Sequence, residues 1–200
     1  DVFFGLEKLG MYTVPVNAAL RSDQLAYILD NSEARFLVID HDMLQYFQPI
    51  AEKVPGIEKV IVNTQGAPDG YTLPPGTINL DEAYSPDIST VKPDVKYNPD
   101  DLCVIMYTSG TTGLPKGVVY RYNNTSVKPL AIITRIIAKK DEVSYTCYPL
   151  FHANALFLSV TIAMHGEGAI ALGEKFSASR FWDDVRHFGA TTFNGLGAVM

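Results

Sequence analysis

The sequence YTSGTTGLPKG at residues 107–117 decides the fold of this chain. It follows an apolar run at residues 102–107 that is typical of a buried strand in a parallel sheet. Glycines in the turn after such a strand allow backbone N–H groups to approach an anion, and hydroxyl and ammonium groups add further donors. The segment therefore predicts a phosphate-binding loop, whose candidate binding residues are Thr108, Ser109, Gly110, Thr111, Thr112, Gly113 and Lys116.

Two other loop motifs do not fit the same residues. The Walker loop GxxxxGK[ST] requires a glycine where Pro115 stands and a serine or threonine where Gly117 stands. The nucleophile elbow GxSxG requires a glycine where Tyr107 stands, two residues before Ser109. A P-loop NTPase and a serine hydrolase are therefore disfavoured, and a turn without function is the remaining alternative to a phosphate loop of another type.

Strand and helix patterns alternate along the sequence on both sides of this loop. The expected strands are residues 12–16, 36–39, 60–62, 102–107, 118–120, 143–147, 169–172 and 191–193. Helices are expected before Gly10, after Ser22, through residues 44–54, 124–138 and 153–164, and between Ser177 and Gly189. This alternation predicts an α/β fold of two βα-type subdomains with largely parallel sheets.

The stretch at residues 64–100 interrupts the pattern with Pro68, Pro74, Pro75, Pro86, Pro93 and Pro99. Prolines prevent long regular elements because they lack a backbone N–H. The expected organisation is a first α/β block at residues 1–63, this proline-rich connection, and a second block at residues 101–200 that carries the loop. Both ends of the sequence interrupt a pattern that normally continues, so we expect all three parts to belong to one truncated domain.

Composition limits the possible partners. The 200 residues carry a net charge of −6 without a long basic run, which removes a general attraction to nucleic acid. Cys103 and Cys147 have no companions at metal-ligand spacing, so no metal site is predicted. The apolar run at residues 153–164 is shorter than the ~20 residues of a membrane-spanning helix. We expect a cytoplasmic protein, with peripheral membrane contact still open.

The loop resembles the signature loop of the adenylate-forming (AMP-binding) superfamily, which includes acyl-CoA synthetases, luciferases and adenylation domains of nonribosomal peptide synthesis. The sequence PLFHANA at residues 149–155 resembles a downstream motif of that superfamily, in which His152 would occupy a gate position. The sequence LEKLGMYTVPVN at residues 6–17 is similar to its early helix–strand segment. The resemblance implies an incomplete N-terminal domain of an adenylate-forming enzyme.

The chain also departs from the pattern of the superfamily. After the loop the superfamily often has Thr-His before a helix-starting asparagine, whereas this chain has Arg121 and Tyr122, and only Asn124 matches. The sequence gives no role for Arg121. A glycine common in the second motif is replaced by Ala155, a small residue that still leaves room for backbone approach.

The resemblance implies a reaction in which a substrate carboxylate attacks the α-phosphorus of ATP, pyrophosphate leaves, and the acyl group then passes from AMP to the thiol of CoA. Ser109, Thr111, Thr112 and Lys116 would meet the β- and γ-phosphates, and Mg2+ would add positive charge. The catalytic candidate is His152, which would orient the carboxylate or gate the path to CoA; its alternative is a helix-start histidine that contacts only backbone. The expected cofactors are ATP, Mg2+ and CoA.

The resemblance also bears on which acid is the substrate. Amino-acid-activating relatives have an aspartate where His152 stands, and without it a buried ammonium group would lack a counter-charge. We therefore expect an acyl acid, and residues 175–200 are similar to fatty-acid and carnitine or crotonobetaine CoA ligases. Both kinds of acid remain open. The isolated fragment is expected to be inactive, and the alternative function is a non-catalytic truncated homologue that binds nucleotide or lipid.

Overall fold

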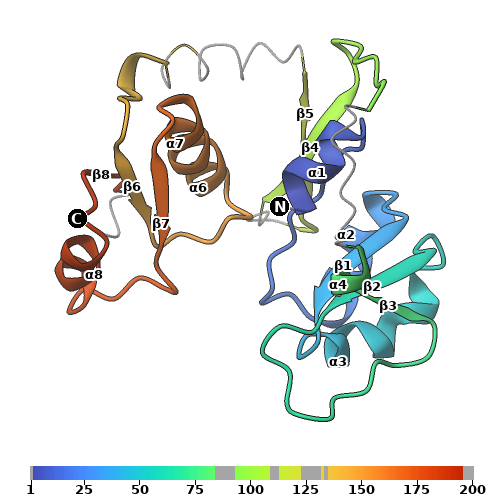
Figure 1. Cartoon of the computed structure of the whole chain (residues 1–200). Helices are drawn as coiled ribbons and strands as arrows, with labels where there is room; N and C mark the ends of the chain where they lie inside the picture. The colour runs from blue at the N-terminus through green and yellow to red at the C-terminus, as the bar shows by residue number, and fades with distance from the viewer. Residues whose placement is uncertain (1, 84–92, 109–112, 123–131, 133–134, 196–200) are drawn as a thin grey trace. The chain divides into compact units, whose positions relative to one another are not determined.

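The structure is a computed structural model that describes residues 2–83, 93–108, 113–122, 132 and 135–195. It divides into two compact units, an N-terminal unit of residues 1–96 with 107–118 and a C-terminal unit of residues 97–106 with 119–200. Each unit contains parallel strands that are connected by helices (Figure 1). The predicted α/β fold with largely parallel sheets is therefore confirmed.

The N-terminal unit contains a parallel sheet of three strands in the order β1-β2-β3. The strands are β1 (Phe36–Asp40), β2 (Lys59–Asn63) and β3 (Thr77–Asn79). The helical elements are α1 (Val2–Lys8), α2 (Ser22–Asn31), α3 (Leu44–Phe47), a 3-10 helix (Gln48–Lys53) and α4 (Leu80–Ala83). The register pairs Val38 with Ile61 and Val62 with Asn79, so the β-branched residues of β1 and β2 lie side by side.

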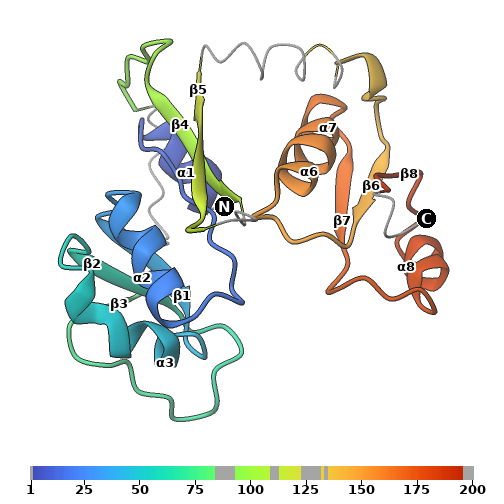
Figure 2. The same ribbon diagram turned by 180° about the vertical axis from the view of Figure 1, so that it is seen from behind.

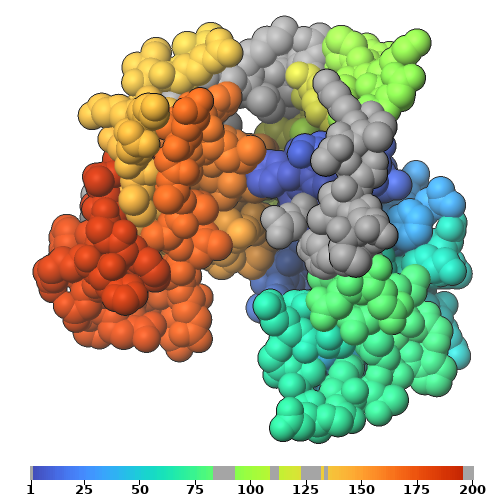
Figure 3. Space-filling view, in the orientation of Figure 1, coloured from blue at the N-terminus to red at the C-terminus, as the bar shows by residue number. Residues whose placement is uncertain are grey.

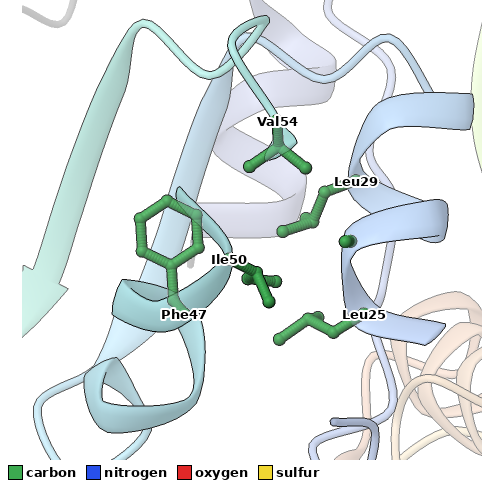
Figure 4. Packing of buried hydrophobic residues seen from close by; sticks show 6 residues of the cluster. Leu25, Leu29, Phe47, Ile50 and Val54 are labelled. Atoms are coloured by element: carbon green, nitrogen blue, oxygen red, sulfur yellow. The ribbon is translucent and has the colours of Figure 1, made fainter. Parts of the chain in front are cut away.

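The core of this unit lies between α2 and the segment that follows β1 (Figure 4). Leu25 and Leu29 are four residues apart and therefore share one face of α2. They pack against the buried side chains of Phe47, Ile50 and Val54. This apolar contact is what the helical spacing in the sequence predicts, and it fixes where α2 ends beside the sheet.

Two expected elements of the N-terminal unit take a different form. The helix expected through residues 44–54 is a four-residue α3 followed by the 3-10 helix, with Pro49 in the first positions of the latter. Proline cannot donate the hydrogen bond that would continue the α-helix. The strand expected at residues 12–16 is reduced to a single bridge at Thr13, and Pro15 likewise removes a donor from any longer ladder.

The C-terminal unit contains a second parallel sheet of three strands, in the order β7-β6-β8. Its strands are β6 (Val143–Thr146), β7 (Ala169–Leu172) and β8 (Thr192–Phe193). The central strand β6 is the most buried of the three. A helical run made of α6 (Ala153–Ala155), a π-helical turn (Leu156–Val160) and α7 (Thr161–His165) connects β6 to β7, and α8 (Phe181–His187) connects β7 to β8.

Figure 2 shows the run α6–α7 on one side of these strands and α8 on the other. In Figure 3 side chains fill the spaces between the ribbon elements of this unit. The last helix begins at Phe181, and the expected start near Ser177 is a turn whose Ser177 carbonyl accepts from the backbone N–H of Arg180 at 3.1 Å and from that of Phe181 at 2.9 Å. The expected helix at residues 124–138 falls largely outside the described residues.

Strands β4 (Leu102–Thr108) and β5 (Lys116–Arg121) form a separate two-stranded sheet. The backbone N–H of Tyr122 donates to the carbonyl of Asp101 at 3.3 Å. At the other end, the hydroxyl of Thr108 donates to the carbonyl of Lys116 at 3.5 Å. These two contacts show that the strands run in opposite directions, so β4 and β5 (Figure 1) form a hairpin, and the glycine-rich segment connects them in the sequence.

Tyr145 organises the core of the C-terminal unit from the centre of β6. Its side chain is 1% exposed, its hydroxyl donates to Asp184 Oδ2 at 3.0 Å, and its ring meets that of Phe181 edge-on at 5.5 Å. A Cβ atom at Gly173 would lie 2.4 Å from the Tyr145 hydroxyl oxygen, so only glycine fits there. Burial first, and then the bond to Asp184, raises the pKa of Tyr145 to about 12.

This raised pKa predicts a loss of stability in alkali. The phenol has a pKa of about 10 in the unfolded chain, so its stabilising contribution is complete below about pH 10 and is lost as the pH rises toward the folded value. We expect the urea concentration at which the C-terminal unit is half unfolded to decrease over this pH range. In Tyr145→Phe most of this decrease should be absent. The fluorescence of Trp182, the single tryptophan, reports the transition. Equal pH dependence in Tyr145→Phe and in the control Tyr71→Phe would contradict the assignment.

Candidate phosphate-binding loop

Strand β4 carries the chain from a buried interior to an exposed end. Val104, Ile105 and Met106 are buried, and Thr108 at the end of the strand is exposed. A strand anchored by buried residues gives the loop after it a fixed starting point, which is how loops on rigid elements are positioned. Of the predicted binding residues, Ser109, Gly110, Thr111 and Thr112 lie outside the described residues. The described part of the site is its two ends, with Thr108 at one and Gly113 and Lys116 at the other.

Those two ends come together across the hairpin. Thr108 and Lys116 are joined by the hydrogen bond from the threonine hydroxyl to the lysine carbonyl. Gly113 is exposed, and a Cβ atom there would meet nothing within 4 Å, so open space surrounds it. An anion can approach backbone that has such space around it.

Lys116 begins β5, and its side chain is exposed. Across the part of the chain that the structure describes, no carboxylate forms an ion pair with its ammonium group. An unneutralised ammonium group at the edge of a glycine-rich loop suits an anionic ligand, because it is a point charge with three rotatable donors.

A side chain that no sequence pattern marked as functional ties this loop to the rest of the N-terminal unit. The hydroxyl of Tyr107, directly before Thr108, donates to Asn31 Oδ1 at 2.7 Å. Asn31 is the last residue of α2, so the bond joins the start of the loop to the end of a helix that packs in the core. Burial is the main cause that raises the pKa of Tyr107, so the phenol remains a donor further into the alkaline range than an ordinary tyrosine.

A second tyrosine strengthens the same helix end. The hydroxyl of Tyr12 lies 2.9 Å from the carbonyl oxygen of Ser32 and 3.2 Å from that of Glu33, and it donates to this pair. The last carbonyl groups of a helix have no partner within the helix, and a side-chain donor satisfies them. Glu33 has φ of 54°, which ends the helix in a left-handed residue. The anchor that receives Tyr107 is therefore itself held in place.

His152 lies in the C-terminal unit, directly before α6. Its backbone N–H donates to the carbonyl of Pro149 at 3.0 Å, and its own carbonyl accepts from Leu156 at 3.1 Å. The side chain is exposed and lies against the ring of Phe151, with 4.3 Å between the ring centres. Both backbone groups of His152 are thus hydrogen-bonded, and its imidazole has no ion pair within the described residues. The geometry fits a histidine that orients the carboxylate or gates the path to CoA, and it equally fits a helix-start histidine that contacts only backbone.

The helical run that begins after His152 contains an irregularity that the sequence did not indicate. Residues Leu156–Val160 form a π-helical turn, which leaves a carbonyl group without its usual partner. The amide of Asn194 donates to the carbonyl of Leu158, and it also donates to Ser159 Oγ at 3.1 Å. Because π-helical turns are frequent at functional sites, Asn194 is a residue that sequence reasoning missed near the His152 helix.

The described ranges contain no group of three or more histidine, cysteine or acidic side chains that could hold a metal ion. Nor does any helix within them have the length and apolarity to cross a membrane. The N-terminal unit has an apolar cavity of about 560 Å³ between α1, residues 10–16 and β1. Of the predicted site residues, the four that the structure describes, Thr108, Gly113, Lys116 and His152, do not line it.

Comparison with known proteins gives matches over nearly the whole chain. The family model described as AMP-binding enzyme matches residues 2–200. The crotonobetaine/carnitine–CoA ligase of Salmonella arizonae is 31% identical over 196 residues, which are 94% of this chain and 36% of that protein. The ligase of the same name from Shigella dysenteriae serotype 1 is 32% identical over 195 residues, again 94% and 36%. The chain thus spans 36% of the length of these curated relatives.

Solved structures agree. A long-chain-fatty-acid–CoA ligase of Archaeoglobus fulgidus superposes with a TM-score of 0.76 at 27% identity, over 96% of this chain and 36% of that one. A fatty acyl CoA synthetase of Mycobacterium tuberculosis superposes with a TM-score of 0.70 at 24% identity, over 99% and 36%; at this identity the likeness shows the fold alone. The resemblance inferred from the loop, and the domain fold that it implied, are confirmed.

Removing the Tyr107 hydroxyl tests its role as an anchor. We expect Tyr107→Phe to destabilise the attachment of the loop by about 1 kcal/mol, since one partly exposed hydrogen bond is lost, without unfolding the unit. Hydrogen exchange of the Tyr107 and Thr108 amides should become faster by a factor of about five. Tyr71→Phe, which alters a tyrosine of the same unit whose ring lies against His41, is the control. Unchanged exchange at both amides would show that the bond to Asn31 does not hold the loop.

Proposed function

The chain belongs to the AMP-binding enzyme family, and from this premise we propose that the protein activates a carboxylic acid with ATP and transfers the acyl group to CoA. The observation that carries the proposal is the glycine-rich loop between β4 and β5, as it is seen at its two described ends. It begins at an anchored strand end, is open around Gly113, and ends at an ammonium group without an ion pair in the described chain. The named relatives are CoA ligases, which supports the second half of the reaction.

In the proposed first step, a carboxylate oxygen of the acid forms a bond to the α-phosphorus of ATP, and the bond to the pyrophosphate oxygen breaks. The protein contributes by alignment and by neutralisation of charge. The ammonium of Lys116 stands at the end of the loop, and we assign it, with Ser109, Thr111 and Thr112, to the β- and γ-phosphates. Thr108, whose hydroxyl donates to the Lys116 carbonyl, completes the proposed binding loop together with Gly110 and Gly113. Mg2+ bound with ATP would add positive charge on the phosphates. The described residues contain no group of three or more histidine, cysteine or acidic side chains that would hold the ion without ATP.

In the proposed second step, the sulfur of CoA attacks the acyl carbonyl carbon and AMP leaves. His152 is our candidate for orienting the carboxylate or gating the approach of CoA. Its exposed imidazole, held at the start of a helical run by two backbone hydrogen bonds, supports that role. A cytoplasmic location, where ATP and CoA are supplied, is part of the same proposal.

The substrate that we propose is an acyl acid and not an amino acid. The position after Phe151 is His152, so no carboxylate stands there to pair with a substrate ammonium group. The names of the relatives support two kinds of acyl acid. The curated ones are called crotonobetaine/carnitine–CoA ligases, and the structural one at 27% identity is called a long-chain-fatty-acid–CoA ligase.

Replacement of Lys116 tests the loop directly. In the full-length protein, meaning a polypeptide of the relatives' length that contains this chain, we expect Lys116→Ala to lower kcat/KM for ATP in pyrophosphate exchange by roughly ten- to a hundredfold. The fold should persist because the side chain is exposed. Lys59→Ala, an exposed lysine at the start of β2, is the matched control. An exchange rate equal to that of the control would remove Lys116 from the phosphate site.

A further expectation concerns the 200-residue chain alone, which spans 36% of the relatives' length. We expect it to form no acyl-CoA, because the reaction requires exclusion of water from a mixed anhydride and groups that hold the nucleoside as well as the phosphates. Incubation with ATP, Mg2+, CoA and either fatty acids or carnitine should release no AMP above the Lys116→Ala chain. Steady production of acyl-CoA would contradict this expectation.

A further inference from the structure

The end of the β4–β5 hairpin opposite the loop carries a contact made by a residue for which the sequence offered no role. Arg121 is the last residue of β5, and its guanidinium Nη1 donates a hydrogen bond to the backbone carbonyl of Asp100, just before β4. The next residue, Tyr122, donates its backbone N–H to the carbonyl of Asp101 at 3.3 Å. Two successive residues therefore fasten the end of β5 to the start of β4.

The turn that receives Arg121 is rigid in its own right. The backbone N–H of Asn98 donates to Asp101 Oδ2 at 2.9 Å. In the other direction, the N–H of Asp100 donates to Asn98 Oδ1 at 3.0 Å and that of Asp101 to the Asn98 carbonyl at 2.9 Å. The carbonyl of Asp100 is thereby presented in one orientation, which a planar guanidinium group can meet with a directional bond.

An aromatic contact completes the fastening, which we call the hairpin clamp: Tyr97, Asp100, Asp101, Arg121 and Tyr122. The rings of Tyr97 and Tyr122 meet edge-on, with 5.1 Å between their centres and an angle of 65° between their planes. This arrangement is favourable for aromatic pairs. The two residues at which this chain departs from the Thr-His pattern of the superfamily, Arg121 and Tyr122, thus both belong to one structure.

The hairpin needs such a clamp because β5 buries too little surface to define its register on β4. Five of the six residues of β5 are exposed, and only Tyr120 is partly buried, with 5.0 Å between its ring centre and that of Phe157. Register is weakly defined in a strand with so little burial, and a two-stranded ribbon is only marginally stable by itself. A slip of two residues would move Lys116 by about 6 to 7 Å along β4. Beside the backbone ladder of the two strands, the side-chain bond from Thr108, at 3.5 Å, is a weak restraint at the loop end.

We propose that Arg121 is a positioning residue for the phosphate loop: through its bond to Asp100 it fixes the register of β5 on β4, and so fixes where Lys116 stands relative to Thr108. The inference rests on the proposed function for its consequence, which is ATP binding. Its structural part, the register, stands on the contacts themselves. Arg121 acts through Lys116 and makes no contact with substrate.

The kinetic test uses the full-length protein and three variants. Arg121→Ala should raise KM for ATP by roughly three- to tenfold, while KM for the acid and for CoA stays within about twofold of the wild-type value. Arg121→Gln should recover part of the loss, since an amide can donate to the Asp100 carbonyl without carrying charge. Arg186→Ala is the matched control, because it removes an exposed arginine of the same unit that is bound to Asp183 at 2.6 Å.

Two kinetic results would overturn the proposal. An unchanged KM for ATP in Arg121→Ala would show that the bond positions nothing. An equal rise in all three KM values would indicate a general structural loss.

A second measurement separates failure of the clamp from failure of the proposed function. If wild-type protein gives no pyrophosphate exchange, the proposed function is wrong, and hydrogen exchange in the 200-residue chain still tests the register. Amides of Val118, Val119 and Tyr120 should exchange at least about threefold faster in Arg121→Ala than in wild type or Arg186→Ala. Equal protection of these amides in all three chains would overturn the clamp whatever the activity.

Discussion

A loop that must offer its backbone and a lysine to an anion cannot use those groups to hold itself in place. Its position must come from its ends, and this constraint organises the structure around residues 107–117. One end is anchored by the buried residues of β4 and by the bond from Tyr107 to Asn31 at the end of α2. The other end depends on β5, which is largely exposed. Two side-chain hydrogen bonds hold this strand on β4, one from Thr108 near the loop and one from Arg121 at the opposite end of the hairpin.

The sequence predicted what depends on local pattern. The loop was recognisable from its glycines, hydroxyls and lysine, and most strands and helices from periodicity, because these signals lie within a few residues of one another. Contacts between distant residues leave no such signal. Tyr107 and Asn31 are 76 positions apart, and Tyr145 and Asp184 are 39 apart, so nothing in either neighbourhood predicts the pairing. The prediction was also wrong where a single residue decides the outcome. The missing N–H groups of Pro49 and Pro15 shortened an expected helix and an expected strand.

The two units of this chain each have a core of their own. In the N-terminal unit it lies between α2 and the segment after β1, and in the C-terminal unit it surrounds Tyr145. The contacts at the two ends of the loop lie within residues that the structure describes, so this chain specifies how the proposed phosphate loop is attached. The chain spans 36% of the relatives' length. The function is therefore best tested in two stages, phosphate binding first and acyl transfer second.

The central claim is that the hairpin presents residues 107–117 to the phosphates of ATP. The most direct measurement is the amide spectrum of the isotope-labelled 200-residue chain, recorded while Mg2+ and inorganic tripolyphosphate are added. The account predicts shifts that are confined to the amides of residues 108–117 and that disappear in the Lys116→Ala chain. Shifts centred elsewhere, or an unchanged spectrum at ligand concentrations well into the millimolar range, would contradict it.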